Sequence, residues 1–329
     1  MIKVKNLNKI FKVHKKEAGF MGSVKSLYNR NYIKKHALDD FSLHIEAGEI
    51  IGLIGSNGAG KTTLTKILSG IIHPTSGHVS VMGFNPWDRK NEYRRNMSVI
   101  MGQKAQLWWD LPAMDGYLLL KEIYQIPAKE FYTSIDYLAE YLDVKDQLNI
   151  QVRRLSLGER MKVELIAALL HKPKVIFLDE PTIGLDLSAQ KAVRSFIKEY
   201  RKENKPTIIL TSHYMDDIEE LCPRICILRS GRKVYDGGLK ELHIQYADSK
   251  VITASLATES DFSQLINTFP SALGEITGAD CQIKIQTPRD KTMEAARYLL
   301  NQTQITDFNI KEDEVGTIIE KILSREGHQ

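Results

Sequence analysis

Short apolar runs recur along the first two thirds of the chain, each bounded by glycine or by charged residues. Three of them, at 49–54, 174–178 and 207–211, are apolar at consecutive rather than alternate positions. Continuous runs of this length are typical of strands buried on both faces of a parallel sheet. Between residues 104 and 170 the apolar residues instead recur at helical spacing, as at Leu119 and Ile123 and then at Phe131, Ile135, Leu138 and Leu142. The pattern predicts an α/β core with a helical subdomain.

The pattern changes after about residue 240. From residue 251 it predicts strand, helix, strand, strand, helix, strand and a closing helix, with the later elements at 261–269, 272–276, 282–286, 291–301, 305–310 and 315–323. That order suggests a small ferredoxin-like α+β domain. We therefore expect two domains, 1–240 and 248–329. The second has no phosphate loop, metal cluster or nucleophile in its sequence, so we expect it to support dimerisation or to have a regulatory role.

Composition restricts the class of protein. The chain has 329 residues, 43% hydrophobic and 26% charged, as expected for globular domains with an ordinary core. Its net charge of +4 is too small to indicate a nucleic-acid-binding face. No apolar run approaches the roughly 20 residues that span a bilayer, and no apolar run follows the basic start. We expect a cytoplasmic protein whose three cysteines are reduced.

A glycine-rich segment follows the first buried run and leads into a helical run. Its residues are Gly55, Ser56, Asn57, Gly58, Ala59, Gly60, Lys61, Thr62 and Thr63. The glycines let the backbone curl so that N–H groups point at phosphate oxygens, and the helix presents its positive end there. Lys61 supplies charge to the outer phosphates and Thr62 a hydroxyl to Mg²⁺. The segment predicts a phosphate-binding loop, which kinases, GTPases, helicases and transporter ATPases all use.

Two carboxylates end the second buried run. Asp179 and Glu180 follow residues 174–178, and ligands bind at the carboxyl ends of strands in open parallel sheets. Asp179 is then placed to hold Mg²⁺, directly or through water, and Glu180 to polarise the attacking water. The alternative is a strand end with solvated acids, against which the phosphate loop argues.

Four further elements indicate a family. Gln103 follows the strand-like run 97–102, Leu155-Ser156-Leu157-Gly158-Glu159-Arg160 has the form of a signature motif, Gly184-Leu185-Asp186 follows Glu180, and the third buried run leads into His213. Together with the two nucleotide motifs, these elements in this order and spacing resemble the ABC ATPase superfamily. The resemblance covers roughly residues 1–240, and is especially close to cassettes that serve export-type permeases.

The resemblance implies a P-loop NTPase core of the ABC type, with a helical subdomain at about 104–170 and an antiparallel β subdomain. It implies ATP and Mg²⁺ as ligands, with Gln103 near the metal, Asp186 in the D-loop and His213 near the γ-phosphate and the attacking water. In such proteins two cassettes meet head to tail, so residues 156–159 of one chain would cover the nucleotide held by the other. The implied partners are a second copy or a related cassette, and integral membrane permease subunits. Through the permease the protein would sit on the inner face of the cell membrane. The permease would carry the choice of transported substrate.

The signature segment can also be interpreted from its residues alone. Ser156 and Glu159 have the S-x-x-E spacing of a helix capping box, and a capped helix N-terminus can still attract a partner's nucleotide. The family's usual second glycine and glutamine are here Leu157 and Glu159. An added carboxylate near a triphosphate should weaken ATP binding unless a capping bond holds it.

Aromatic residues leave alternatives open at two places. Phe11 lies where the family carries an aromatic that stacks on adenine, with Tyr32 or simple core packing as the alternatives. Trp108 and Trp109 follow Gln103, where they could contact a permease helix or pack within the subdomain.

Residues 12–36 form an insertion relative to the family's short link. It carries seven Lys or Arg residues against one acid, Glu17, while Phe20, Val24, Leu27 and Tyr28 recur at helical spacing. A basic amphipathic helix against a membrane surface or a permease fits this pattern, and so does a solvated loop whose aromatics tuck onto the parent domain.

Rival functions explain fewer of these elements. A GTPase or a small-molecule kinase would leave the signature motif and His213 unexplained. An ABC protein of translation usually has two cassettes in one chain, and a DNA-repair member has a long heptad insertion. A scaffold that binds ATP without hydrolysing it would not need Glu180 and His213, and Mg²⁺-dependent phosphate release separates it from an enzyme.

Overall fold

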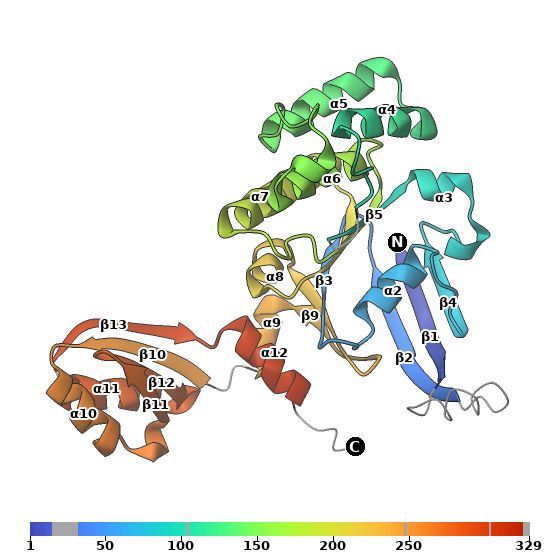
Figure 1. The fold of residues 1–329 in the computed structure, drawn as a ribbon. Helices are drawn as coiled ribbons and strands as arrows, with labels where there is room; N and C mark the ends of the chain where they lie inside the picture. Colours follow the sequence, from blue (N-terminus) through green and yellow to red (C-terminus); the bar gives the residue numbers. More distant parts are fainter. Residues whose placement is uncertain (15–31, 103–104, 247–248, 303, 325–329) are drawn as a thin grey trace, which may run out of the picture. The chain divides into compact units, whose positions relative to one another are not determined.

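The computed structural model describes residues 1–14, 32–102, 105–246, 249–302 and 304–324 (Figure 1). The chain divides into two compact units, Met1–Asp236 and Gly237–Gln329. Within the described residues, no helix combines the length and the apolar character needed to cross a membrane.

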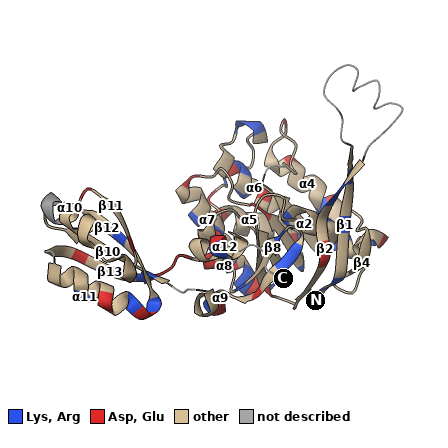
Figure 2. Cartoon of the chain, turned by 90° about the horizontal axis from the view of Figure 1, so that it is seen from below, with Lys and Arg blue, Asp and Glu red and all other residues tan. Residues whose placement is uncertain are grey.

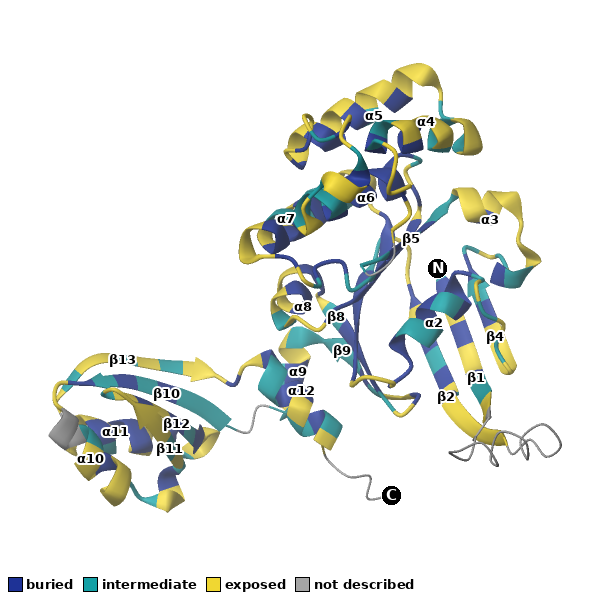
Figure 3. Cartoon of the chain, viewed as in Figure 1, coloured by how far each residue is buried: buried dark blue, intermediate teal, exposed yellow. Residues whose placement is uncertain are grey.

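The core of unit 1 is a six-stranded sheet with the order β5-β6-β7-β3-β8-β9. Its strands are β3 (Ile50–Ile54), β5 (Met97–Met101), β6 (Val175–Asp179), β7 (Thr207–Thr211), β8 (Arg224–Arg229) and β9 (Arg232–Gly238). The pairs formed among β5, β6, β7, β3 and β8 are parallel. Every residue of β3 and β7 is buried, as the continuous apolar runs predict (Figure 3). The parallel strands bring the segments that follow β3, β6 and β7 to one edge of the sheet.

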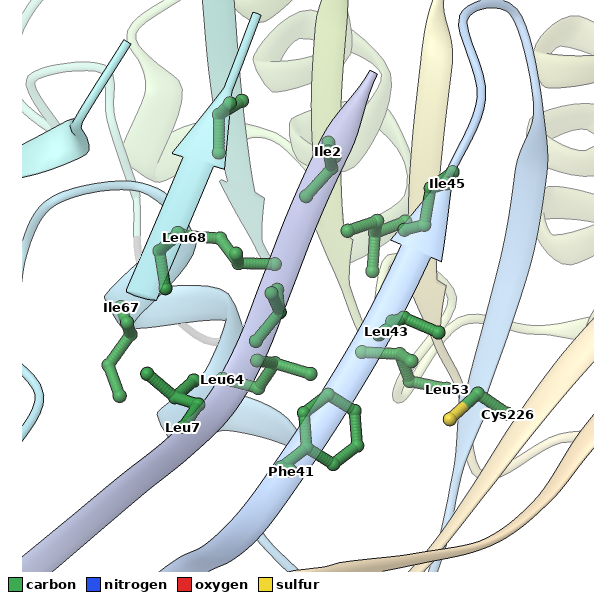
Figure 4. Close-up of a cluster of buried hydrophobic side chains, with 14 of the residues drawn as sticks. Ile2, Leu7, Phe41, Leu43, Ile45, Leu53, Leu64, Ile67, Leu68 and Cys226 are labelled. Atoms are coloured by element: carbon green, nitrogen blue, oxygen red, sulfur yellow. The ribbon is translucent and has the colours of Figure 1, made fainter. Parts of the chain in front are cut away.

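A second, antiparallel sheet with the order β2-β1-β4 packs beside this core. Its strands are β1 (Ile2–His14), β2 (Tyr32–Ile45) and β4 (Ser76–Val81). Its buried face meets α2 (Lys61–Leu68) and the core sheet, so that Phe41 of β2, Leu64 of α2 and Leu53 of β3 belong to one cluster (Figure 4). The cluster includes Leu64, Ile67 and Leu68 of α2 and Ala59 of the loop before it, so it anchors that loop. The strands β1 and β2 enter both ends of the predicted insertion, but its apolar stripe lies outside the described residues.

The helices α4, α5 and α6 lie together at one end of unit 1 (Figure 1, green). Besides α2, the unit contains α3 (Asn91–Arg95), α4 (Ala113–Tyr124), α5 (Ala128–Tyr141), α6 (Leu157–Leu169), α7 (Leu187–Asn204) and α8 (Met215–Leu221). On α5 the predicted apolar face, with Phe131 and Ile135 among it, is buried. The helix predicted from Leu119 and Ile123 is present as α4. These two side chains are 41% and 55% exposed, however, so their apolar face is turned to solvent and not to the core.

Unit 2 contains a four-stranded antiparallel sheet with the order β11-β12-β10-β13. Its elements are α9 (Leu239–Tyr246), β10 (Ser249–Leu256), α10 (Glu259–Thr268), β11 (Glu275–Ala279), β12 (Gln282–Pro288), α11 (Thr292–Gln302), β13 (Ile305–Glu312) and α12 (Val315–Ser324). The strand predicted at 272–276 begins only at Glu275, because residues 271–273 form a 3-10 turn after Pro270.

Candidate functional site

The predicted phosphate-binding loop lies between the end of β3 and the start of α2, and its glycines are needed where the chain turns. Gly60 precedes α2 with a φ of 111°, a value that side-chain-bearing residues rarely adopt. A Cβ atom on Gly60 would also lie 2.4 Å from the carbonyl oxygen of Ala37 in β2. The loop is therefore pressed against the antiparallel sheet, and only glycine fits there.

Lys61 crosses this loop from the first turn of α2. Its Nζ donates hydrogen bonds to the carbonyl oxygens of Gly55 at 2.5 Å and Ser56 at 3.3 Å. Burial lowers the pKa of Lys61 below its usual range, while the carboxylates of Glu180 and Asp179 act in the opposite direction. The ammonium group is thus held at the loop, with the two predicted acids as the charges that act on it.

Asp179 and Glu180 lie where β6 ends beside β7. The Thr211 hydroxyl donates to Oδ1 of Asp179 at 2.6 Å, and the backbone N–H of Glu180 lies 3.0 Å from the carbonyl oxygen and 3.2 Å from the hydroxyl of Thr211. The backbone of Glu180 has a φ of 56°, in the left-handed region that side-chain-bearing residues seldom occupy. Strain of this kind, where observed, concentrates at functional sites.

His213 follows β7 and reaches Glu180. Its Nε2 atom lies 2.9 Å from Oε1 of Glu180, although the two residues are on loops after different strands. The side chain of Glu180 is 20% exposed and that of His213 is 42% exposed, so water can reach both. The predicted base and the predicted switch histidine therefore meet at one point.

A pocket of about 490 Å³ opens between the phosphate-binding loop and the antiparallel sheet. Phe11 lines it, on the side formed by β1, and Glu180 lines it as well. The full lining is Phe11, Lys12, Val13, Lys35, Ala37, Asn57, Gly58, Ala59, Gly60, Lys61, Thr62, Thr63 and Glu180. Tyr32, the alternative aromatic, pairs with His14 at the far end of the β1–β2 ladder. This geometry favours Phe11 as the aromatic nearest the loop.

Comparison with known proteins agrees with this arrangement. A family model described as ABC transporter matches residues 38–183. The ABC transporter ATP-binding protein NatA of Bacillus subtilis is 33% identical over 207 residues, which cover 63% of this chain and 84% of that protein. The chain belongs to the ATP-binding proteins of ABC transporters.

Two further likenesses place this ABC ATPase among its relatives. The Nod factor export ATP-binding protein I of Burkholderia thailandensis is 34% identical over 213 residues, which cover 65% of this chain and 69% of that protein. The dimeric post-hydrolysis structure of the ATP-binding cassette MJ0796, bound to ADP and Pi, has a TM-score of 0.60 and covers 72% of this chain and 98% of that one. At 22% identity that likeness shows the fold alone. The predicted fold class is confirmed for the cassette, and the chain is the ATP-hydrolysing subunit of a transporter.

In this ABC subunit the signature segment forms the predicted capping box at the start of α6. The carboxylate of Glu159 accepts from the backbone N–H of Ser156 at 2.9 Å and from its hydroxyl at 2.8 Å, and Gln147 donates to it at 3.1 Å. The Ser156 hydroxyl lies 3.3 Å from the backbone N–H of Glu159. These bonds, the backbone bond from Ser156 first, lower the pKa of Glu159. The extra carboxylate is therefore held by a capping bond.

The D-loop lies next to the signature segment within the same chain. A Cβ on Gly158 would lie 3.2 Å from the Cβ of Ala189, and one on Gly184 would lie 3.0 Å from Leu157. Asp186 caps α7 by accepting from the backbone N–H of Ala189 at 2.8 Å. None of residues 156–159 is among the described residues that line the nucleotide pocket. The structure thus brings the signature segment to Gly184 and Ala189, which flank Asp186, and not to its own phosphate-binding loop.

The oxygen donors near the loop fit a magnesium ion. Thr62, whose side chain carries a hydroxyl, lines the pocket, and Asp179 ends β6 with a carboxylate; Mg²⁺ prefers oxygen ligands. No group of three or more His, Cys, Asp or Glu side chains suited to a metal occurs in the described part of the chain. Mg²⁺ is usually held by one or two protein ligands together with phosphates and water, and the oxygens of Thr62 and Asp179 would be such ligands. Gln103, the third predicted metal residue, lies outside the described residues.

Three residues of this region were missed in the sequence. Thr211 bonds both acids, Lys35 lines the pocket, and a Cβ on Gly102 would lie 2.1 Å from the carbonyl oxygen of Glu180. The glycine before Gln103 and the polar residue at the end of an apolar strand were visible signals. The partners of Thr211 and Gly102 could not be seen in the sequence, because these contacts join neighbouring parallel strands that are far apart along the chain.

Proposed function

We propose that two copies of this chain, or this chain and a related cassette, dimerise head to tail and drive a separate integral membrane permease in the direction of export. The contact between Glu180 and His213, beside a pocket lined by the phosphate-binding loop, carries the proposal. The named function of the Nod factor export relative supports the direction, and the dimeric MJ0796 structure supports the pairing. The permease then selects the transported substrate.

Glu180 is the general base in this proposal. When bound, ATP with Mg²⁺ supplies the phosphoryl group and the charge that neutralises its oxygens. Glu180 accepts a proton from the attacking water, and His213 orients that carboxylate and the water from the next loop. Lys61 would supply charge to the outer phosphates, Thr62 and Asp179 would hold the metal with Gln103, and Phe11 would stack on adenine.

The signature segment acts on the nucleotide of the partner cassette. Ser156 and Gly158 lie at the N-terminus of α6, where backbone N–H groups and the helix dipole favour an anion. The carboxylate of Glu159 is turned back toward Ser156, whose N–H and hydroxyl donors offset part of the repulsion that its charge would exert on a triphosphate.

The helical subdomain is the proposed contact with the permease. It exposes large apolar side chains in the described residues: Trp108 at 54%, Trp109 at 51%, Leu111 at 43%, Leu119 at 41% and Ile123 at 55%. Trp109 also packs under the Arg160 guanidinium at 5.2 Å, so of the two tryptophans Trp108 is the better candidate for a partner. Docking there would hold the protein at the cytoplasmic face of the cell membrane, with no role for nucleic acid.

Residues 248–329 are a separate domain in this proposal, after an ABC domain at 1–240. The β-α-β-β-α-β order of β10 to β13 supports a ferredoxin-like fold, and support of the dimer or regulation is its proposed role.

The decisive experiment measures Mg²⁺-dependent phosphate release and ATP binding by the Glu180→Gln variant. We expect ATP to bind while turnover falls by about 10² to 10⁴-fold, the usual contribution of a positioned base. The ATP-bound dimer should accumulate. Glu140→Gln is the matched control, since Glu140 lies on α5 and pairs only with Lys145 among the described residues. Near-normal hydrolysis by Glu180→Gln would remove Glu180 from the role of base.

A further inference from the structure

A buried carboxylate lies directly behind the loops that carry Glu180 and His213. Asp217 is on α8 and is 0% exposed. Its Oδ2 atom accepts a short hydrogen bond from the Thr182 hydroxyl and another, at 2.6 Å, from the Ser212 hydroxyl. Thr182 lies two residues after Glu180, and Ser212 immediately precedes His213. One oxygen atom therefore joins the two loops that meet at the reaction site.

The Ser212 hydroxyl closes the turn that carries His213. It accepts a hydrogen bond from the backbone N–H of Tyr214 at 3.0 Å and donates its own proton to Asp217. The Ser212 hydroxyl thus ties the residue before His213 to the residue after it, and both to Asp217. On the other loop, Thr182 is 1% exposed and follows Pro181, whose ring restricts the backbone. Neither hydroxyl can turn away to water, so each loop is fixed to the same oxygen.

Asp217 is itself held by a buried cation. Nη1 of Arg194, on α7, lies 3.0 Å from Oδ1 of Asp217, and the Arg194 side chain is 3% exposed. Nε of Arg194 lies 2.9 Å from Oε1 of Glu220, an ion pair whose angle is not that of a hydrogen bond. Lys198 donates to the other oxygen of Glu220 at 2.7 Å. The two cations of this chain of charges lie on α7 and the two carboxylates on α8, whose charged residues are all Asp or Glu (Figure 2).

Such an arrangement costs desolvation free energy that simple packing would not, because a buried ion pair seldom stabilises more than apolar residues of the same size. Both oxygens of the carboxylate are used, and two of the three donors belong to loops of the reaction site. We infer that Asp217 is a positioning residue for ATP hydrolysis, which sets the distance between Glu180 and His213 by holding Thr182 and Ser212. The inference rests on the proposed roles of Glu180 and His213.

The test removes the two hydroxyls and leaves the buried charges in place. Thr182→Val and Ser212→Ala should each lower kcat by about tenfold with the KM for ATP within about twofold, because only the geometry of the reacting groups changes. Thr182→Ser keeps the hydroxyl and should restore near-normal kcat. Combining Thr182→Val with Ser212→Ala should lower kcat by less than the product of the single effects, because both act through one oxygen.

Thr207→Val is the matched control for stability. Thr207 is equally buried, at 1%, and its hydroxyl bonds the backbone at the opposite end of β7. It should lower the melting temperature as much as Thr182→Val does while kcat is kept. If Thr182→Val and Ser212→Ala turn over like Thr207→Val, Asp217 only stabilises the fold and the inference is wrong.

Glu180→Gln, assayed beside these variants, separates the two proposals. If Glu180→Gln hydrolyses ATP slowly while Thr182→Val and Ser212→Ala keep a near-normal kcat, only the positioning role of Asp217 is overturned. A fast Glu180→Gln overturns the assignment of the base and the positioning of that base with it.

Discussion

The α-carbon of Gly102 lies against the backbone of Glu180, so closely that a Cβ on Gly102 would be 2.1 Å from the carbonyl oxygen of Glu180. The backbone N–H of Gly102 also donates to the carbonyl oxygen of Asp179 at 2.9 Å. The end of β5 thereby supports the turn that aims the Glu180 side chain.

Gly102→Ala should therefore slow hydrolysis by about 10²-fold, the effect of moving a catalytic group by about 1 Å. It should also lower stability by about 1 to 3 kcal/mol, because backbone must shift to admit the methyl group. Gly116→Ala is the control, since a Cβ there would meet only the flexible tip of Leu107. Phosphate release and urea unfolding measure both effects, and equal behaviour of the two variants would contradict the expectation.

Phe11→Ala should raise the KM for ATP by about tenfold, because stacking on a base contributes about 1 to 3 kcal/mol. The kcat at saturating ATP should change little, since Phe11 lines the pocket on the side of β1 and not at the acids. Tyr32→Ala, at the far end of the same ladder, should leave KM unchanged. A larger effect of Tyr32→Ala would reverse the assignment of the adenine platform.

A chain with Lys61→Ala, mixed with a chain carrying Gly158→Asp, should regain part of the activity that each homodimer lacks. Each heterodimer would hold one site made from an intact phosphate-binding loop and an intact signature segment. Phosphate release is measured after mixing, with subunit exchange verified by differently tagged chains. Mixing that restores nothing, although heterodimers form, would indicate sites completed within one chain.

Glu159→Ala should destabilise the protein by about 0.5 to 2 kcal/mol at pH 7, the usual contribution of a helix cap. The folded pKa of Glu159 is lowered, chiefly by the backbone N–H of Ser156. Its stabilising effect is therefore complete above the ordinary glutamate pKa of about 4.3 and is lost as pH falls through the lower folded value. Urea unfolding at pH 7, 5 and 4 should give the same difference at the first two values and a smaller one at the last. Glu140→Ala, at an exposed position of α5, is the control.

Replacing Lys15, Lys16, Lys25 and Lys34 by Gln should weaken permease-dependent membrane association while soluble hydrolysis stays nearly intact. Attraction to anionic headgroups contributes about 1 kcal/mol per basic residue and fades with salt. Lys35 is best left unchanged, because it lines the nucleotide pocket. Association that persists unchanged at low salt would favour a loop packed on the parent domain.

Much of the core could be predicted because its signals are local. The strands β3, β6 and β7 follow from continuous apolar runs, and the phosphate-binding loop from glycines whose conformations few other residues adopt. The S-x-x-E spacing likewise predicts the capping box of Ser156 and Glu159.

What the sequence did not reveal depends on contacts across the fold. Thr182 and Ser212 meet at Asp217 only because β6 and β7 are neighbours and α8 packs behind them, an order that periodicity does not encode. The outward orientation of Leu119 and Ile123 has the same origin, since helical spacing defines a face but not what covers it. The late start of β11 shows that local turn chemistry around Pro270 outweighs strand propensity.

The left-handed backbone of Glu180, with its φ of 56°, means that the residue needed for activity is not the one that this backbone conformation favours. A residue with a side chain gives up about 1 kcal/mol or more in that conformation, which glycine adopts freely. Glycine loses more conformational freedom on folding, which offsets part of that gain, but a screen for heat resistance alone would not select against an inactive Glu180→Gly variant. Screens on this scaffold need an activity step in every round.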